Sequence, residues 1–247
     1  MTTRDGDAAG ERPARGREPA PGHVPWTPEL VLLAARAAQL GLGPRAGEGA
    51  IPQDFARRDF LASRRLRLRE LGYADVRALT ELGEDDRVHA ALVDARMRSL
   101  AEVVGLVVWA NQIYRDRPGL GIWRADADGG FMGVFSLVPI PGTNEVEIGT
   151  RLLPRAWGRG YALEGGAALC DHAFSRIGLE RLVGLCHPEN RSVPPLLMRL
   201  GFRADGSTLH FGNRALRFVL ERAAWSGAVP RRGRARTQAA PEALGCG

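Results

Sequence analysis

The chain has 247 residues, and 45% of them are hydrophobic, enough to bury a globular core. Its net charge is +6, but arginines gather in the two tails, so the composition does not favour specific nucleic-acid binding. The three cysteines form no CxxC pair, which argues against a zinc site and for a reducing compartment. No apolar run is long enough for a membrane span. We therefore expect a cytoplasmic protein without membrane or metal.

The two ends of the chain differ in composition from its middle. Residues 1–25 are rich in Gly, Pro, Ala, Arg and Asp, and residues 226–247 are small and basic, so both are predicted to be disordered tails. Residues 26–58 are predicted as an N-terminal helical extension, because a Thr-Pro pair there suits a helix start. This extension could pack on the main domain or mediate a homodimer. The folded domain is expected at 59–225.

The first half of that domain reads as a strand, two or three helices and then more strands. Residues 63–71 alternate leucine with charge, as a half-buried strand does. Helices are expected at 73–82 and, as one or two segments, within 85–113. Three strands with short Asp-, Gly- and Pro-containing turns follow and predict an antiparallel meander. They are 121–125, 131–140 and 145–153.

Residues 145–178 read as a strand, a glycine-bearing turn and a long amphipathic helix. Pro154 ends the strand because proline has no N–H to donate. The helix is expected at 161–177, where apolar residues recur at steps of four and three. Residues 181–187 suit a strand buried on both faces, and a strand–helix–strand crossover implies a parallel pair. The sheet is therefore predicted to be mixed.

The turn before this helix suits a phosphate group. The first N–H groups of a helix have no internal partner, and the helix dipole places partial positive charge there. Gly158 and Gly160 allow close approach of a bulky anion, and Arg155 and Arg159 add full charges. A P-loop is excluded because the chain has no lysine, and a dinucleotide fingerprint is excluded because Leu163 replaces its third glycine. On spacing alone, an ordinary strand-to-helix turn remains the alternative.

The last elements are a short helix and a hairpin. Residues 192–200 are expected to be helical, with two prolines in the first turn, where they are tolerated. Residues 209–211 and 215–223 are expected to pair through Gly212-Asn213, which is a strong hairpin turn.

The turn resembles the coenzyme A-binding motif of the GNAT N-acetyltransferases, [Q/R]-x-x-G-x-[G/A], here Arg155-x-x-Gly158-x-Gly160. The resemblance runs from about Arg65 to Arg222. It implies the GNAT acyl-CoA N-acyltransferase fold: an α/β protein whose central, mixed, mostly antiparallel sheet has one splayed parallel strand pair and flanking helices. Further matches resemble the branch that acetylates ribosomal-protein N-termini; they are Glu147-Ile148-Gly149, Pro154, Trp157 to Ala162 and Glu164.

The resemblance also implies acetyl-CoA as co-substrate. In the family, the pantetheine arm lies between the splayed strands, so Leu152 and Leu153 would contact it through the backbone. Backbone N–H groups from Arg159 to Ala162 would hold the pyrophosphate, and Asn190 would lie near the thioester. The implied acetyl-CoA-binding residues are Leu152, Leu153, Arg155, Gly158, Arg159, Gly160, Tyr161, Ala162 and Asn190.

Glu147 is the leading candidate for a general base, because the motif strand borders the acceptor site in the family. A lysine-like amine with a pKa of about 10.4 needs a base more than an α-amine of about 7.7–8.0 does. A structural carboxylate is the alternative for Glu147, and His187, at a strand end, is the second candidate. The remaining histidines have no motif around them and are expected to be structural; they include His89, His172 and His210.

The thiolate that leaves in the reaction must either receive a proton or come from a thiol with a low pKa. Asn190 matches a family asparagine, but Val193 stands where relatives usually place a serine or tyrosine. Ser192 is one residue early, and could act in catalysis or cap the helix. A thiol with a pKa of about 8.5 also leaves tolerably without a dedicated acid.

The predicted function is transfer of the acetyl group of acetyl-CoA to a primary amine by direct attack in a ternary complex. The acceptor is a protein N-terminus or a small molecule. Two alternatives stay open: a catalytically weak CoA-binding GNAT-like regulatory domain and, with less support, a basic nucleic-acid-binding protein.

Overall fold

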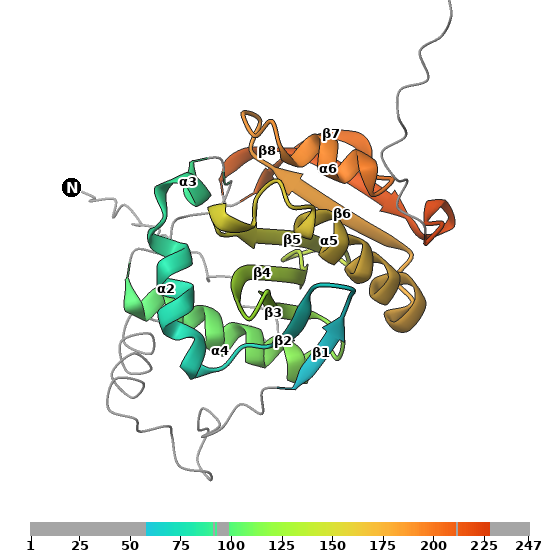
Figure 1. Cartoon of the computed structure of the whole chain (residues 1–247). Coiled ribbons are helices and arrows are strands. Elements are labelled where there is room, and N and C mark those ends of the chain that lie inside the picture. Colours follow the sequence, from blue (N-terminus) through green and yellow to red (C-terminus); the bar gives the residue numbers. More distant parts are fainter. Residues whose placement is uncertain (1–57, 91, 93–98, 211, 228–247) are drawn as a thin grey trace, which may run out of the picture.

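Eight strands form one mixed sheet in the order β1-β2-β3-β4-β5-β6-β8-β7 (Figure 1). The structure is a computed structural model, and it describes residues 58–90, 92, 99–210 and 212–227. The predicted tail at 1–25, nearly all of the predicted extension and most of the C-terminal tail lie outside the described residues. The strands are β1 Asp59–Ala62, β2 Arg67–Glu70, β3 Gly121–Ala127, β4 Gly130–Pro139, β5 Val146–Leu152, β6 Arg181–Cys186, β7 Arg203–His210 and β8 Asn213–Glu221.

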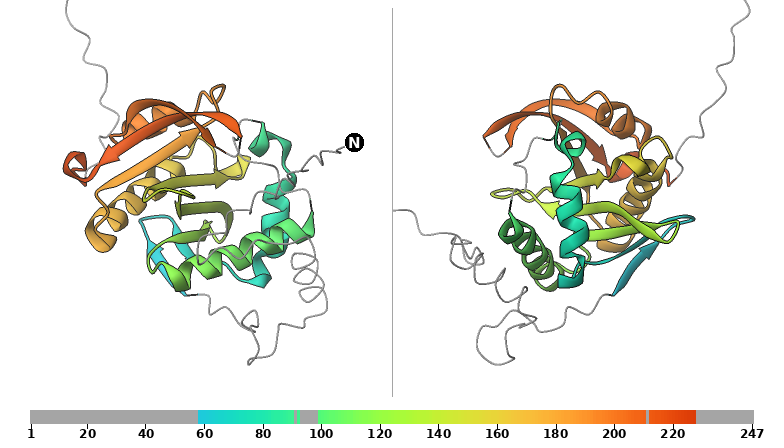
Figure 2. Two further views of the ribbon diagram at one scale, coloured as in Figure 1. Left: turned by 180° about the vertical axis from the view of Figure 1, so that it is seen from behind. Right: turned by 60° about the vertical axis from the view of Figure 1, so that its left-hand side comes forward.

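Helices cover both faces of this sheet. Figure 2 shows α4 and α5 on opposite sides of it. The main helices are α2 Val76–Glu84, α3 Asp86–His89, α4 Leu100–Asp116, α5 Tyr161–His172 and α6 Val193–Arg199. In the part of the chain that the structure describes, no helix has the length and apolar character to cross a bilayer.

The alternation of side chains along the strands separates two cores. Trp123 and Phe135 pack with Leu169 of α5, whereas Ile122 and Val134 pack with Leu79 of α2 on the other face. Successive residues of a strand point to opposite faces, so each of these strands supplies both cores. This explains why β3 and β4 are apolar almost throughout.

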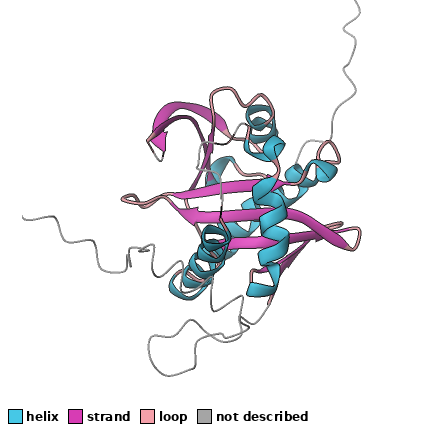
Figure 3. Ribbon diagram, turned by 90° about the vertical axis from the view of Figure 1, so that its left-hand side faces the viewer, coloured by secondary structure: helices cyan, strands magenta, loops and turns pink. Residues whose placement is uncertain are grey.

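The predicted antiparallel meander and the mixed sheet are confirmed. β3, β4 and β5 pair antiparallel in chain order, and β5 and β6 form the one parallel pair among the described strands. The β7–β8 hairpin curves over the far end of the sheet (Figure 3).

Several element boundaries differ from the predictions. Strand β1 was not predicted, and only Arg67–Glu70 of the expected strand at 63–71 is extended, because Ser63 N–H donates to Leu66 O (2.9 Å) and closes a turn. The long helix ends in a π-helical turn, Ala173–Ile177, before left-handed Gly178. β7 begins at Arg203, six residues earlier than expected. Four-residue strands and bulged strands lack the alternating pattern that reveals longer ones.

Candidate active site

The parallel strands β5 and β6 touch at one point and then separate. Their paired position is Glu147 opposite Val183. Leu153 N–H donates to Met132 O of β4 (2.9 Å), so by alternation the backbone groups of Leu152 and Thr150 face the β6 side. The diverging strands thus leave an extended backbone edge of β5 facing the gap.

The end of this edge leads into a turn whose conformation requires glycine. Gly158 and Gly160 have φ values of 71° and 81°, in the left-handed region where a Cβ is unfavourable. The first helical bond of α5 runs from Glu164 N–H to Gly160 O (3.0 Å). The N–H groups of the preceding residues therefore have no intrahelical acceptor and form a donor cluster at the helix start. The predicted glycine-bearing turn into a helix is present.

The two arginines of the motif have different surroundings. Arg155 Nη1 lies 2.7 Å from Glu81 Oε1 of α2, and its Nη2 donates to Phe131 O of β4 (2.7 Å). Arg159 is 59% exposed and has its Nη1 3.7 Å from Asp128 Oδ2. Arg155 thus joins the turn to neighbouring elements, whereas Arg159 remains beside the turn, open to solvent.

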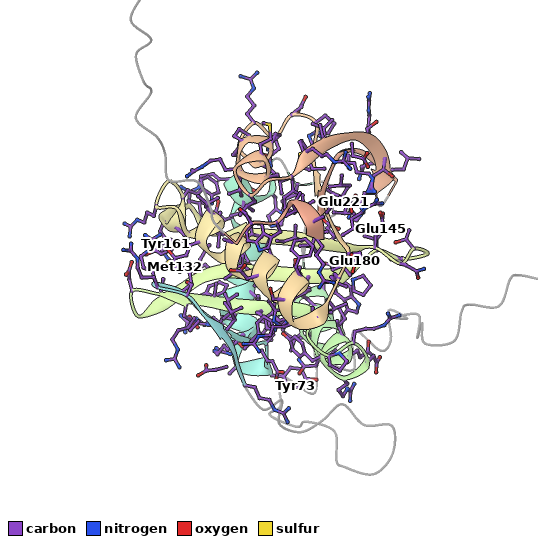
Figure 4. All side chains as sticks on the ribbon, turned by 90° about the vertical axis from the view of Figure 1, so that its right-hand side faces the viewer. Tyr73, Met132, Glu145, Tyr161, Glu180 and Glu221 are labelled. Carbon is purple, nitrogen blue, oxygen red and sulfur yellow. The ribbon has the colours of Figure 1, made fainter. Side chains whose placement is uncertain are left out.

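The aromatic residues of the motif brace the turn. Trp157 Nε1 donates to Leu152 O (2.8 Å), and the Tyr161 hydroxyl donates to Asp128 Oδ2 (2.7 Å). The Tyr161 ring is buried. Figure 4 shows Tyr161 and Glu145 at opposite ends of the region that β5 spans.

Glu147 lies beside His210, whose proximity could not be predicted from the residues around either position. Val146 and Ile148 pack on the α5 side, so Glu147 faces the side covered by α2 and α4. His210 Nε2, at the end of β7, lies 3.6 Å from Glu147 Oε2, and the two side chains are 13% and 18% exposed. His187 instead accepts a bond from Glu189 N–H (3.2 Å) within its own exposed turn.

A second charged group holds the same end of β5 to the hairpin. Glu145 Oε1 accepts from Arg217 Nη2 of β8 (2.8 Å) and lies 3.6 Å from Arg181 Nη1 of β6. Arg217 Nε also lies 3.0 Å from Asp205 Oδ2 of β7. These ion pairs close the end of the β5–β6 pair that the glycine turn does not occupy.

The structure revises the expected helix cap after β6. Asn190 Oδ1 accepts from Ser192 N–H, Ser192 Oγ and Val193 N–H at 3.0, 3.0 and 3.1 Å. Ser192 makes no capping hydrogen bond with its side chain. The asparagine therefore caps this turn, and the serine hydroxyl is directed at the asparagine. Among the described residues, no group of His, Cys, Asp and Glu is arranged to hold a metal ion.

Comparisons with known proteins agree with this geometry. The FsC-acetyl coenzyme A-N(2)-transacetylase of Aspergillus fumigatus is 30% identical over 132 residues, which are 50% of this chain and 56% of that protein. The chain thus matches little more than half the length of this fungal relative. A solved acetyltransferase of Agrobacterium tumefaciens is 26% identical, with a TM-score of 0.58 over 70% of this chain and 99% of that one.

A second solved structure is similar to this chain in its fold. It is the RimL ribosomal L7/L12 alpha-N-protein acetyltransferase, 19% identical, with a TM-score of 0.59 over 69% of this chain and 98% of that one. The family model of the GNAT acetyltransferase domain matches residues 65–203, more than half of the chain. The splayed strand pair, the glycine turn and these matches together show that the chain belongs to the GNAT acetyltransferase family.

Proposed function

We propose that this protein transfers the acetyl group of acetyl-CoA to a primary amine by direct attack in a ternary complex. The observation that carries the proposal is the divergence of β5 and β6 beside a left-handed glycine turn at the start of α5. An extended thioester arm fits an open strand edge, and a diphosphate fits free N–H groups at a helix start.

Acetyl-CoA is assigned to the residues whose backbone is still available. Leu153 N–H donates to Met132 O and Leu153 O accepts from Ala156 N–H (2.8 Å), so both of its backbone groups already have protein partners. We therefore assign the arm to the N–H of Leu152, whose carbonyl already accepts from Trp157 Nε1 (2.8 Å), and to the backbone of Thr150. The diphosphate is assigned to the N–H groups from Arg159 to Ala162, with the Arg159 charge beside them. Arg155 acts by holding the turn in place.

Glu147 is proposed as the base that takes the proton from the attacking amine. Its carboxylate lies on the α2/α4 face at the narrow end of the strand pair, beside His210. A carboxylate accepts a proton from an ammonium ion poorly unless the amine is already weakly basic, so an α-amine, with a pKa of about 7.7–8.0, suits this base better than a lysine-like amine.

The leaving thiolate is proposed to depart without a dedicated acid. The Ser192 hydroxyl already donates to Asn190 (3.0 Å) and would have to break that bond to protonate sulfur. A thiol of pKa about 8.5 is a good leaving group at neutral pH. Asn190 is assigned a positioning role near the thioester, because it orders the turn that follows β6.

The acceptor is proposed to be an α-amine, either of a protein N-terminus or of a small molecule. The RimL structure is named for acetylation of a ribosomal-protein α-amine and the fungal relative for an N(2)-transacetylase, so both names support a nitrogen acceptor. A screen of acetyl-CoA turnover by thiol release, against N-terminal peptides and small amines, distinguishes them.

The donor assignment is tested with two glycine variants. Gly158 and Gly142 both have positive φ (71° and 75°), and a Cβ at either position would meet no atom within 4 Å, so valine strains both turns similarly. Gly158→Val should weaken acetyl-CoA binding at least about tenfold in calorimetry, a loss of about 1.4 kcal/mol. Gly142→Val, in the β4–β5 turn, should bind normally.

Three outcomes are decisive. Absence of acetyl-CoA affinity in the unaltered protein overturns the proposed function. Equal affinities of the two valine variants would place the diphosphate elsewhere. Binding without turnover on any amine would indicate a CoA-binding domain that does not catalyse acetyl transfer.

A further inference from the structure

The turn between β1 and β2 lies on the first turn of α5, about a hundred residues away along the chain. Ser63 Oγ and Arg65 N–H donate to Glu164 Oε1 at 2.7 and 2.8 Å, and Arg65 Nε donates to Glu164 Oε2 at 2.7 Å. One carboxylate therefore holds a backbone N–H and two side chains of this turn. None of these residues belongs to the glycine motif.

Arg65 continues from Glu164 to the glycine turn itself. Its Nη1 donates to Arg159 O (3.0 Å), and its guanidinium lies over the Tyr161 ring at 4.5 Å from the ring centre. Its Nη2 is 3.5 Å from the point where a Cβ on Gly160 would stand. The planar guanidinium thus spans the start of α5 with three separate contacts, which a lysine cannot reproduce.

The bond to Arg159 O determines where a neighbouring donor points. In a trans peptide the C=O of one residue and the N–H of the next are directed oppositely. Because Arg65 holds the Arg159 carbonyl, the Gly160 N–H is held facing away from Arg65. Glycine in the left-handed region has little conformational preference of its own to keep this peptide plane in place. The orientation of the peptide therefore depends on the arginine.

The charge of Arg65 has an effect of its own. A cation at a helix N-terminus is disfavoured by the helix dipole, so helix stability alone does not account for it. Glu164 offsets this cost. Burial raises the pKa of Glu164, but hydrogen bonds from Ser63 and Arg65 and the Arg65 charge outweigh burial and lower that pKa, which keeps the carboxylate ionised at neutral pH. An anionic ligand on the N–H side of this peptide would have Arg159 beside it and the Arg65 charge behind the peptide.

We propose that Arg65 is a positioning residue for the diphosphate of acetyl-CoA: it orients the Arg159–Gly160 peptide so that its N–H faces the ligand, and it places a fixed positive charge behind that peptide. This inference rests on the proposed function. It assigns a role in donor binding to the β1–β2 turn, a segment that lies outside the motif strand, glycine turn and helix.

Calorimetry with acetyl-CoA tests the proposal. Arg65→Met should raise the Kd at least about tenfold. Arg65→Lys keeps the positive charge without the planar guanidinium, so its Kd should lie between those of Arg65→Met and the unaltered protein. Arg67→Met is the matched control, because Arg67 is in the same hairpin, 71% exposed, with one ion pair to Asp59 at 2.8 Å. Its Kd should not change.

A shortened donor separates positioning of the diphosphate from general loosening. S-acetylpantetheine carries the thioester arm without the diphosphate, so its kcat/KM should be the same in Arg65→Met, Arg65→Lys and the unaltered protein. With acetyl-CoA, KM should rise in the variants while kcat at saturation and the KM of the acceptor amine stay within about twofold, because only donor binding is affected.

The outcomes that overturn the inference are distinct from failure of the proposed function. An unchanged Kd for Arg65→Lys and Arg65→Met, or equal losses with acetyl-CoA and S-acetylpantetheine, would show that Arg65 has no diphosphate role. If Arg65→Met does not fold, Arg65→Lys is tested with acetyl-CoA and S-acetylpantetheine instead. The lysine variant keeps the backbone bond from residue 65 to Glu164. An unaltered protein without acetyl-CoA affinity would instead refute the proposed function.

Discussion

Asp75 is the most deeply buried carboxylate among the described residues, with 1% of the residue exposed. Arg69 donates to both of its oxygens at 2.6 and 2.8 Å, Arg124 Nη1 lies 3.1 Å away, and Gly72 N–H donates at 3.0 Å. The group ties the start of α2 to β2 and β3. A buried charge that is fully paired in this way is costly to break on one side.

Asp75→Asn should therefore lower the free energy of unfolding by about 3 kcal/mol, because Arg69 and Arg124 lose their buried counter-charge and keep only the more exposed Asp126. Urea denaturation at pH 7 measures this. Asp59→Asn is the control, since Asp59 is 67% exposed in its pair with Arg67, and its effect should be far smaller. Similar losses in the two variants would contradict the assignment.

The pKa of Asp75 predicts how the stability of the protein changes with pH. Burial raises the pKa of Asp75, but hydrogen bonds from Arg69 and Gly72 and the charges of Arg69 and Arg124 outweigh burial, and its pKa is lowered. Its contribution is then complete above the unfolded aspartate value of about 3.9 and is lost as pH falls through the folded pKa. Unfolding curves from pH 7 to acid should show a shallower loss in Asp75→Asn than in the unaltered protein.

Glu147 of β5 and Glu145, which directly precedes this strand, are two carboxylates two residues apart, so Glu145 serves as the control for Glu147. Glu147→Gln should lower kcat at least about 10²-fold, the usual effect of losing a general base, with acetyl-CoA affinity unchanged. Glu145→Gln should mainly lower stability, because Glu145 is bonded to Arg217. Steady-state kinetics with an active amine decide; a full rate in Glu147→Gln would place the base elsewhere.

At the scale of elements, α5 approaches the sheet closely because two glycines face its neighbours. A Cβ on Gly165 would lie 2.3 Å from Phe135 Cζ, and one on Gly166 would lie 2.9 Å from Leu200 Cδ1. Phe135 is fully buried and has little room to move. The seating of α5, and with it the position of the glycine turn, depends on these small residues.

Gly165→Ala should lower the free energy of unfolding by about 1–3 kcal/mol through overpacking. Gly105→Ala in α4 is the control, since a Cβ there meets nothing within 4 Å; it should stabilise by up to about 1 kcal/mol, as alanine is the better helix former. Thermal unfolding of the two variants should therefore shift in opposite directions. A gain in stability for Gly165→Ala would show that α5 is seated more loosely.

At the scale of the whole molecule, two parts of the sheet meet at the candidate site. β1 to β5 carry α2 and α4, β6 to β8 carry α6, and α5 connects them. Between the parts, β5 and β6 pair at the single position Glu147–Val183, reinforced by the ion pairs of Glu145 with Arg217 and Arg181. A ligand between the diverging strands would complete the contact between the two parts.

Acetyl-CoA should therefore stabilise the folded protein as a whole. At a concentration one hundred times its Kd, it should raise the free energy of unfolding by about 2.7 kcal/mol by mass action. Thermal unfolding with and without ligand measures the shift. At the same ligand concentration, the unfolding temperature of Gly158→Val should rise less. Equal rises in the two proteins would show that the glycine turn does not contribute to acetyl-CoA binding.

The sequence by itself determined the strand–turn–helix motif, the meander and the mixed sheet. These features rest on local rules: proline ends a strand, glycine permits positive φ at 158 and 160, and apolar periodicity marks the helix and the buried strands. The turn geometry could therefore be predicted from residues 145–178, and the family resemblance extended that prediction to acetyl-CoA.

The tertiary structure alone decided which distant side chains meet. It placed His210 beside Glu147, directed Arg155 to Glu81, and set Arg65 on Glu164. Each of these contacts joins residues far apart in the chain, and none has a local pattern that reveals it. Such pairs depend on how strands and helices pack over the whole sheet, because a charged side chain is drawn to whichever partner the folded backbone brings within reach.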